Sequence, residues 1–349
     1  MQHIRCVEKK PVISRFFSKL YPKIFIAIIV DLAKTDIYVE ILSNNKVKKS
    51  LSRSFDTTTI DKRIEAFIAE YAKESPYCYI ALLDKSPTQG AIPTCSTSKM
   101  GDFCDIQNSV YKCFNNEWAY FTSSYELENI KLEYKKVGID FIFSPFIIIA
   151  KFFKDRIDSS CAMFLLVEEN FLTLAIFKNS KLLYADHIDL EYQKGQKLNI
   201  STSLGSRDDD NLDIMGGIDI ENIDLDGSGE KFDDLASIEE LDISDGFDDF
   251  STTNDSSLKA KEEHHKPKNE AVNHNYERFV LIQNSLNTFY KDKKYNAEFV
   301  EALYVADAIG LDNDFKSYVE DEMFLSVHVR KIDLPTTLLE IAKAEVNEL

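Results

Sequence analysis

The sequence has 349 residues, of which 44% are hydrophobic and 29% charged, values typical of a globular protein with room for two domains. Its formal net charge is −18, but residues 201–258 alone hold 18 acidic and 2 basic residues, so the remainder is close to neutral. This distribution argues against nucleic-acid binding, which needs a basic face, and no apolar run approaches the roughly 20 residues of a membrane-spanning helix.

The apolar run Ile24–Val30 lies near the start of the sequence, where it has to be distinguished from a targeting signal. It follows Lys23, ends at Asp31 and has no small-residue cleavage site, so it is typical of a buried strand. We therefore expect a cytoplasmic protein, in which cysteines are more often free thiols than disulfides. The cysteines predicted to be free thiols are Cys6, Cys78, Cys95, Cys104, Cys113 and Cys161.

Three of these cysteines, Cys95, Cys104 and Cys113, recur at intervals of nine residues. Zinc sites usually bring their ligands in closely spaced pairs, and neither such a pair nor a neighbouring histidine is present. His187, at the end of a predicted strand, has no partnered nucleophile in the sequence pattern. The sequence therefore predicts no metal site and no hydrolase triad.

The first half of the chain predicts strands and helices in a mixed order. Three apolar or alternating segments come first, and a helix follows with Thr57 or Thr58 as its N-cap. Residues 84–121, rich in Ser, Thr, Pro and Cys, are expected to be an inserted loop region. The predicted strands are 24–31, 36–42, 46–54, 77–83 and 140–144, and the predicted helices are 57–73, 126–136 and 146–153, the last opened by Pro145.

The second half repeats this order around a long acidic insertion. Residues 193–274 contain too little contiguous apolar surface to offset chain entropy, so we expect them to be disordered. Pro335 is expected to break the chain before the last helix. The predicted strands are 163–168, 171–177, 181–188, 298–305 and 325–332, and the predicted helices are 277–291, 313–323 and 336–348.

The acidic insertion has two further interpretations besides a solvated loop. Short alternations of apolar and acidic residues, such as Ile218-Asp219-Ile220, favour a docking motif for a basic or hydrophobic partner. Residues Asp224–Gly229 resemble the start of a calcium loop, but the twelfth position is Leu235 and lacks the bidentate carboxylate. We therefore expect no calcium site there.

Two strand-turn-strand segments carry a resemblance to a known family. The segments are Ile26–Ile41 (IAIIVDLAKTDIYVEI) and Met163–Leu183 (MFLLVEENFLTLAIFKNSKLL). They resemble the corresponding parts of the pilus-assembly protein PilM and of the cytoplasmic part of the type II secretion protein GspL. The resemblance extends over residues 24–83, 138–190 and 275–332.

This resemblance implies an α/β fold of tandem actin-like (RNase H-like) modules, with mixed sheets flanked by helices. The expected organisation is an N-terminal extension over 1–22, a first module over 23–155 with the insertion at 84–121, and a second module over 156–349, interrupted by the acidic loop at 193–274.

In actin-like proteins the turn after the first strand of each module approaches the phosphates of a nucleotide. The matching positions in this chain depart from the family pattern, because Ala33 stands for a Gly, and Val167 and Glu169 replace the expected Asp and Gly of the second turn. We therefore expect a vestigial nucleotide cleft with no cofactor, and ATP with Mg²⁺ as the alternative. Its residues are Asp31, Lys34, Thr35, Glu168, Asn170 and Gly310.

By resemblance, the expected function is that of a non-catalytic cytoplasmic scaffold in a type IV pilus, type II secretion or DNA-uptake machine. Its partners would be an inner-membrane PilN-like protein and the assembly ATPase, and it would be peripheral to the inner membrane through them. Two alternatives stay open. In the first, the chain is an active actin-like ATPase or sugar kinase. In the second, it is an adaptor that acts mainly through its acidic tract.

Overall fold

The structure, a computed structural model, describes residues 21–44, 46–192 and 268–348. Most of the expected N-terminal extension, residues 193–267 of the expected disordered tract and the calcium-like segment therefore lie outside the described residues. Residues 268–274 were also assigned to that tract by composition. They form instead the first turns of helix α6 (Lys268–Lys291).

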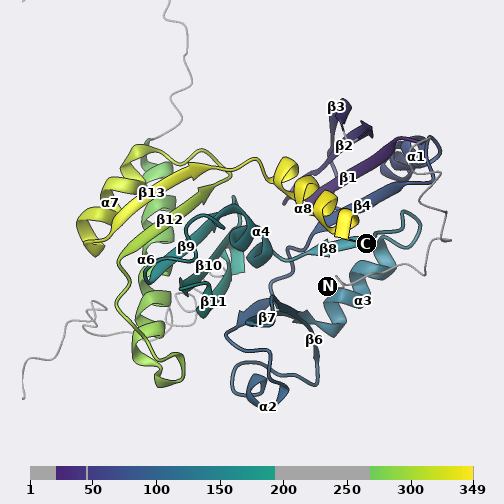
Figure 1. Cartoon of the computed structure of the whole chain (residues 1–349). Helices are drawn as coiled ribbons and strands as arrows, with labels where there is room; N and C mark the ends of the chain where they lie inside the picture. Colours follow the sequence, from purple (N-terminus) through teal and green to yellow (C-terminus); the bar gives the residue numbers. More distant parts are fainter. Residues whose placement is uncertain (1–20, 45, 193–267, 349) are drawn as a thin grey trace, which may run out of the picture. The chain divides into compact units, whose positions relative to one another are not determined.

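Two five-stranded sheets make up the framework (Figure 1). In each sheet the first three strands along the chain form an antiparallel meander. The fourth strand pairs in parallel with the first, and the fifth pairs in parallel with the fourth. The first sheet has the order β3-β2-β1-β4-β8, with β1 (Lys23–Val30), β2 (Thr35–Ser43), β3 (Lys46–Phe55), β4 (Cys78–Leu83) and β8 (Phe141–Phe143). The second has the order β11-β10-β9-β12-β13, with β9 (Ala162–Val167), β10 (Phe171–Lys178), β11 (Lys181–Asp189), β12 (Ala302–Asp307) and β13 (Ser326–Lys331).

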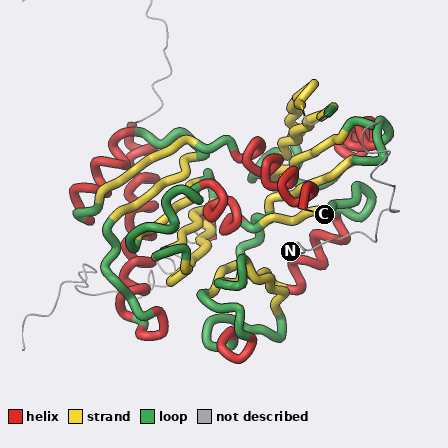
Figure 2. Tube along the Cα trace, in the orientation of Figure 1, coloured by secondary structure: helices red, strands yellow, loops and turns green. Residues whose placement is uncertain are grey.

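This repeated strand order confirms the expected α/β fold with tandem actin-like modules. The central strands β1 and β9 are almost entirely apolar and buried, because helices cover both faces of each sheet. Helices α1 (Lys62–Ala72) and α3 (Ser124–Glu133) share one apolar cluster with the first sheet, and α6 and α7 (Asn313–Met323) share another with the second. Figure 2 shows these helices against their sheets.

The helices α4 (Pro145–Phe152) and α8 (Leu334–Glu348) each pack on the sheet of the other half of the chain. Helix α4 follows β8 of the first sheet but packs on β9 and β10 of the second, whereas α8 follows β13 and packs on β1 and β4. The third apolar cluster therefore contains side chains of both sheets and both helices. Burial of apolar surface in this shared cluster ties the two halves together.

Residues 84–121 are not a loop region, contrary to the expectation from their composition. They form most of a small three-stranded sheet, β5-β7-β6, with β5 (Gly90–Ile92), β6 (Ser109–Phe114) and β7 (Trp118–Ser123), together with the short helix α2 (Thr97–Met100). Trp118, the single tryptophan, is buried against Phe177 of the second sheet. Composition misled here because this sheet is built on a few apolar residues placed between many polar ones.

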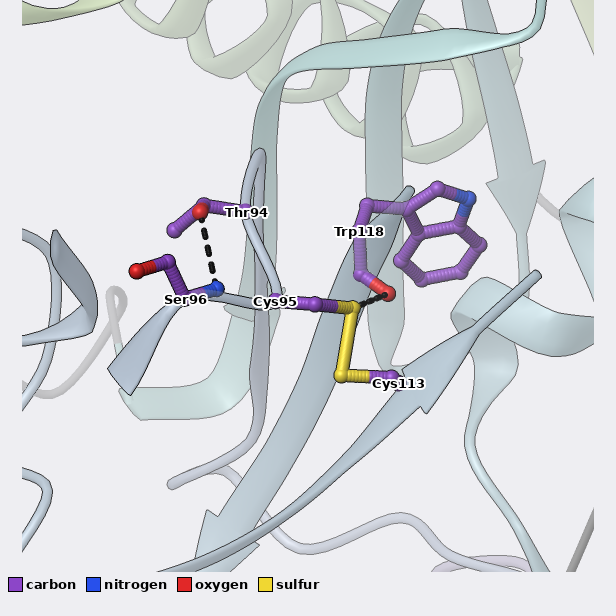
Figure 3. The surroundings of a disulfide bond; sticks show 5 residues. All are labelled: Thr94, Cys95, Ser96, Cys113 and Trp118. Carbon is purple, nitrogen blue, oxygen red and sulfur yellow. Dashed lines mark hydrogen bonds between the residues drawn. A yellow bond between two sulfur atoms is a disulfide. The ribbon is translucent and has the colours of Figure 1, made fainter. Parts of the chain in front are cut away.

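The prediction of six free thiols is wrong for one pair, since Cys95 and Cys113 form a disulfide (Figure 3). Strands β5 and β6 pair with opposite sides of β7, and the chain beyond β5 returns so that the two Cα atoms lie 5.6 Å apart. This separation lies in the normal range for a disulfide. Cys95 Sγ also lies 3.3 Å from the carbonyl oxygen of Trp118, whereas Cys78, Cys104 and Cys161 form no disulfide within the described residues.

Two helix starts also differ from the sequence prediction. Helix α1 begins at Lys62 because the carboxylate of Asp61 accepts hydrogen bonds from the backbone amides of Arg63 and Ile64 and acts as the N-cap, in place of Thr57 or Thr58. Pro335 lies inside the first turn of α8, where a missing N–H costs no hydrogen bond.

Candidate functional site

A cavity of about 670 Å³ lies at the carboxyl ends of the central strands of both sheets, which is where ligands bind in open α/β sheets. The turns after β1, β4, β9 and β12 contribute to its wall, together with α6 and the start of α8. Its lining residues are Ile29, Asp31, Lys34, Asp36, Tyr38, Lys85, Glu168, Glu169, Arg278, Ala308, Ile309, Ile332, Asp333, Leu334 and Pro335.

One of the lining residues, Lys85, lies between two carboxylates of the cavity wall. The ammonium of Lys85, two residues beyond β4, lies 2.6 Å from Oδ1 of Asp31 and 3.1 Å from Oε1 of Glu168. Asp31 follows the first strand of the first sheet and Glu168 the first strand of the second. One lysine therefore joins the two turns that the family resemblance assigns to the phosphates of a nucleotide.

The Lys85–Glu168 ion pair is largely buried, so breaking it would cost more stability than breaking an exposed ion pair. Burial raises the pKa of Glu168 against the opposing effect of Lys85, and among the described residues the carboxylate has no hydrogen-bond partner beyond the Lys85 ammonium. Burial also disfavours the charge on Lys85, but Glu168 and Asp31 outweigh it and hold the pKa of the ammonium above its usual value. Removal of the lysine would leave a buried carboxyl group with no cation beside it.

A second basic side chain, Arg278 of α6, borders the same cavity and is only 8% exposed. Its Nε has no hydrogen-bond partner among the described residues, and Nη2 donates a long 3.5 Å bond to the carbonyl oxygen of Glu169. Burial lowers the pKa of the guanidinium, against the attraction of Glu169, Glu277 and Asp307. Arg278 is therefore a charged group whose hydrogen-bonding capacity is only partly used.

The turn after β12 is closed by a carboxylate. Asp307 is buried, and its two oxygens accept hydrogen bonds of 2.8–3.0 Å from the backbone amides of Ile309, Gly310 and Leu311. Gly310 adopts a φ of +81°, which favours glycine. The amides that would approach a ligand are thus used within the turn.

Of the six residues assigned to the cleft from the sequence, Asp31, Lys34 and Glu168 line the cavity. Lys34 forms an ion pair with Asp36 at 3.0 Å.

The other three have local structural contacts. The hydroxyl of Thr35 donates to the carbonyl oxygen of Thr57 at 2.7 Å, the carbonyl of Asn170 accepts from the amide of Leu190, and Gly310 belongs to the turn closed by Asp307.

Sequence reasoning missed Lys85 and Arg278. A signal for Lys85 was present, because it lies two residues beyond the apolar strand Cys78–Leu83, and the carboxyl ends of parallel strands meet at one edge of a sheet. The prediction that residues 84–121 form one loop region obscured this signal. Arg278 carries no comparable signal, since a single arginine on a long polar helix is usually solvated.

The cavity is lined by more acidic than basic side chains. Three basic and five acidic side chains line it, and the basic groups nearest the turns are already paired with carboxylates. A phosphate placed there would meet carboxylates at a cost of about 1 kcal/mol or more for each close pair. Within the described part of the chain there is no cluster of three or more His, Cys, Asp or Glu side chains that could hold a metal ion.

A polar layer beside the cavity connects the turn after β4 to the second sheet. Gln89 donates from Nε2 to the carbonyl oxygens of Asp84 and Ser86, and accepts from the hydroxyl of Ser144 at 2.9 Å. His187 of β11 lies 3.5 Å from Gln89, while its Nδ1 lies 2.8 Å from the hydroxyl of Thr173. Burial lowers the pKa of His187 to about 4, so the ring is neutral near pH 7.

Comparison with family models divides the chain at the boundary between its two sheets. A domain of unknown function (DUF8569) matches residues 21–150, and a second (DUF8341) matches residues 163–347, more than half of the chain. The chain belongs to the DUF8341 family. The DUF8341 region contains Glu168 and Arg278, and the DUF8569 region contains Asp31 and Lys85. The Lys85–Glu168 ion pair therefore joins the two matched regions.

The chain matches none of the curated proteins. Several solved structures are similar at low identity. A PilM–PilN type IV pilus biogenesis complex is 11% identical, with 90% of this chain and 94% of that chain covered and a TM-score of 0.42. MreB 5 of Spiroplasma citri, bound to AMPPNP, is 10% identical over 93% and 97%, with a TM-score of 0.43, and the ethanolamine utilization protein EutJ from Carboxydothermus hydrogenoformans is 8% identical over 92% and 89%, with a TM-score of 0.37. These likenesses are too weak to select one activity or partner.

In the described residues no helix is long and apolar enough to cross a membrane.

Proposed function

We propose that this chain is a non-catalytic actin-like scaffold, in which the Lys85 ammonium occupies the place that a nucleotide-bound cation would take. The observation that carries this proposal is the pair of contacts from Lys85 to Asp31 and Glu168. Active sites that bind Mg²⁺ with a nucleotide keep their carboxylates free for the metal and its water. In this cleft both carboxylates already have a partner supplied by the chain itself.

The machine that the scaffold serves follows from the sequence resemblance to PilM and to the cytoplasmic part of GspL. On that basis we place it in a type IV pilus, type II secretion or DNA-uptake machine, in the cytoplasm and peripheral to the inner membrane. Its partners there are the cytoplasmic tail of a PilN-like inner-membrane protein and the assembly ATPase. The Lys85 contacts support the absence of catalysis, and the resemblance supports the choice of machine.

A nucleotide- or sugar-phosphate-binding enzyme is the second candidate function. It is favoured by the size of the cavity, about 670 Å³, and by the partly unused guanidinium of Arg278 at its wall. In this candidate, Asp31 and Glu168 would hold Mg²⁺ in place of the Lys85 ammonium. Titration with Mg-ATP separates the two candidates.

The scaffold proposal is tested by fractionation of cells that carry or lack the other genes of the machine. We expect the protein to sediment with membranes when the inner-membrane partner is present and to remain in the supernatant when that partner is deleted. A matched test with the Lys85→Ala variant shows whether the cleft matters for recruitment. Membrane association that persists without every candidate partner would contradict the proposal.

A further inference from the structure

Strand β3 is an open edge of the first sheet. It is ten residues long, and only its last residue, Phe55, is buried. One side pairs with β2, and among the described residues no strand pairs with the other side. A row of backbone N–H and C=O groups is therefore available along an edge about 30 Å long.

The side chains of this edge are strongly basic. The segment KVKKSLSRSF contains Lys46, Lys48, Lys49 and Arg53 and no acidic residue. None of these four side chains forms an ion pair with any residue that the structure describes. The Arg53 guanidinium lies 5.0 Å from the ring centroid of Phe55, and Lys49 Nζ lies 6.0 Å from that of Tyr71. These contacts hold two of the charges beside the strand without neutralising them.

The corresponding edge of the second sheet is closed. Strand β11 lies at the equivalent end of that sheet, but β5 packs against it, and the side chains of Leu182 and Tyr184 are buried. Of the two meander edges that the structure describes, β3 is therefore the open one, and this openness does not follow from the repeated fold.

We propose that β3 is a docking edge for an extended acidic segment of a partner protein, which adds to the first sheet as a further strand. Strand addition supplies backbone hydrogen bonds, and alternate side chains of the peptide supply specificity. Opposite charges on facing strands are favourable, whereas like charges are unfavourable. The lysines therefore discriminate against a second copy of this chain on the same edge and favour an acidic partner.

Fluorescence anisotropy with the full chain tests this inference. The probe is a labelled ten-residue peptide in which Glu alternates with Val or Thr, and the control peptide carries Pro in place of each Val and Thr. We expect the first peptide to bind and the second to bind at least about tenfold more weakly, because proline has no N–H to donate to the strand. Hydrogen exchange of residues 46–55 should slow only with the first peptide.

Matched charge reversals locate the binding edge. We expect the Lys48→Glu/Lys49→Glu variant to raise the dissociation constant of the peptide about tenfold or more, equivalent to about 1.4 kcal/mol. The control variant Lys62→Glu/Lys135→Glu changes the same net charge at exposed positions outside β3 and should leave binding unchanged. Circular dichroism and thermal melting verify that both variants fold.

Three outcomes would overturn the inference. Equal binding of the proline peptide would mean general charge attraction without strand addition. Tight binding of single-stranded DNA at the same lysines, with no binding of the acidic peptide, would mean a nucleic-acid surface. Dimerisation of the chain through β3 would mean that a second copy is the occupant. The inference does not depend on the state of the cleft, since it is measured by peptide binding and not by nucleotide binding or membrane recruitment.

Discussion

The two sheets have the same strand order but bury their meander edges differently. Both hairpins turn in two residues, between Ser43 and Lys46 in the first sheet and between Lys178 and Lys181 in the second, and both carry a register shift just beyond the turn. Val47 and Leu182 are therefore equivalent positions. Val47 is 52% exposed, whereas Leu182 is 3% exposed.

This difference arises from the small sheet inserted into the first half of the chain. Its strand β5 covers β11, and its Trp118 packs on Phe177 of β10. The first sheet receives no such cover, and its edge carries lysines where the second sheet carries apolar side chains. The comparison shows that the repeated framework fixes the strand order, while one insertion determines which edge stays accessible to a partner.

The largest expected effect concerns the ion pair that joins the two halves. We expect Lys85→Met to lower the free energy of unfolding by about 3–5 kcal/mol, because Glu168 would remain buried without a cation. Urea denaturation measures this change. The control is Lys34→Met, which removes a half-exposed lysine paired with Asp36 and should cost about 1 kcal/mol or less. Equal losses of unfolding free energy in the two variants would mean that the Lys85 contacts stabilise the fold no more than the Lys34–Asp36 ion pair does.

A pair of alanine substitutions tests the difference between the two edges directly. Leu182→Ala should cost about 2–5 kcal/mol because it leaves a cavity in a packed core. Val47→Ala, at the equivalent position, should change the free energy of unfolding by less than about 0.5 kcal/mol. The extra methylene of leucine accounts for only about 0.8 kcal/mol of this difference. Similar losses at both positions would show that β3 is buried in solution.

The disulfide stabilises the inserted sheet that covers β11. Cys95 and Cys113 are 18 residues apart, so we expect Cys113→Ser or reduction to cost about 3 kcal/mol. The measurement is the melting temperature with and without reductant. Cys104→Ser is the matched control, because Cys104 lies in the same small cluster and is free. A melting temperature that does not respond to reductant in the native protein would mean that the bond does not form.

The smallest expected effect is a pH dependence that arises at His187 of the covered edge. Its pKa in the folded protein is about 4, below the unfolded value of about 6.5, so the unfolded chain binds the proton first as pH falls. The contribution of the neutral ring is fully present above pH 6.5 and is lost as pH falls towards 4, by about 1–3 kcal/mol. Urea denaturation between pH 4 and pH 7 measures the slope.

Replacement of the ring separates this effect from other titrations. His187→Gln should flatten the pH dependence over that window, whereas His328→Gln, at an exposed position, should leave it unchanged. A pH dependence of the unfolding free energy that persists in His187→Gln would mean that other groups cause it.

The fold was predictable from the sequence where local pattern determines structure. The continuous apolar runs of β1 and β9 identified the central strand of each sheet, because a strand that is covered on both faces is apolar throughout. Helix α7 was predicted with its exact limits, Asn313–Met323. In each case neighbouring residues carry the signal.

The features that sequence reasoning missed depend on contacts between distant segments. Cys95 and Cys113 meet only because both flank β7, and their spacing of 18 residues carries no sign of this. Lys85 and Glu168 are 83 positions apart and belong to different sheets. The exchange of α4 and α8 between the halves is likewise invisible to periodicity, which shows that a helix has an apolar face but not which sheet covers it.

Isothermal titration calorimetry with Mg-ATP tests most directly whether the cleft is vestigial, because the Lys85 ammonium already lies between Asp31 and Glu168. We predict no measurable binding to the native chain at millimolar nucleotide. The control is the same titration of the Lys85→Ala variant. Binding by this variant would mean that Lys85 alone blocks the cleft, whereas no binding would mean that the cleft has also lost its phosphate-binding geometry. A micromolar dissociation constant for the native chain, abolished by Asp31→Ala, would contradict the account and establish the chain as a nucleotide-binding enzyme.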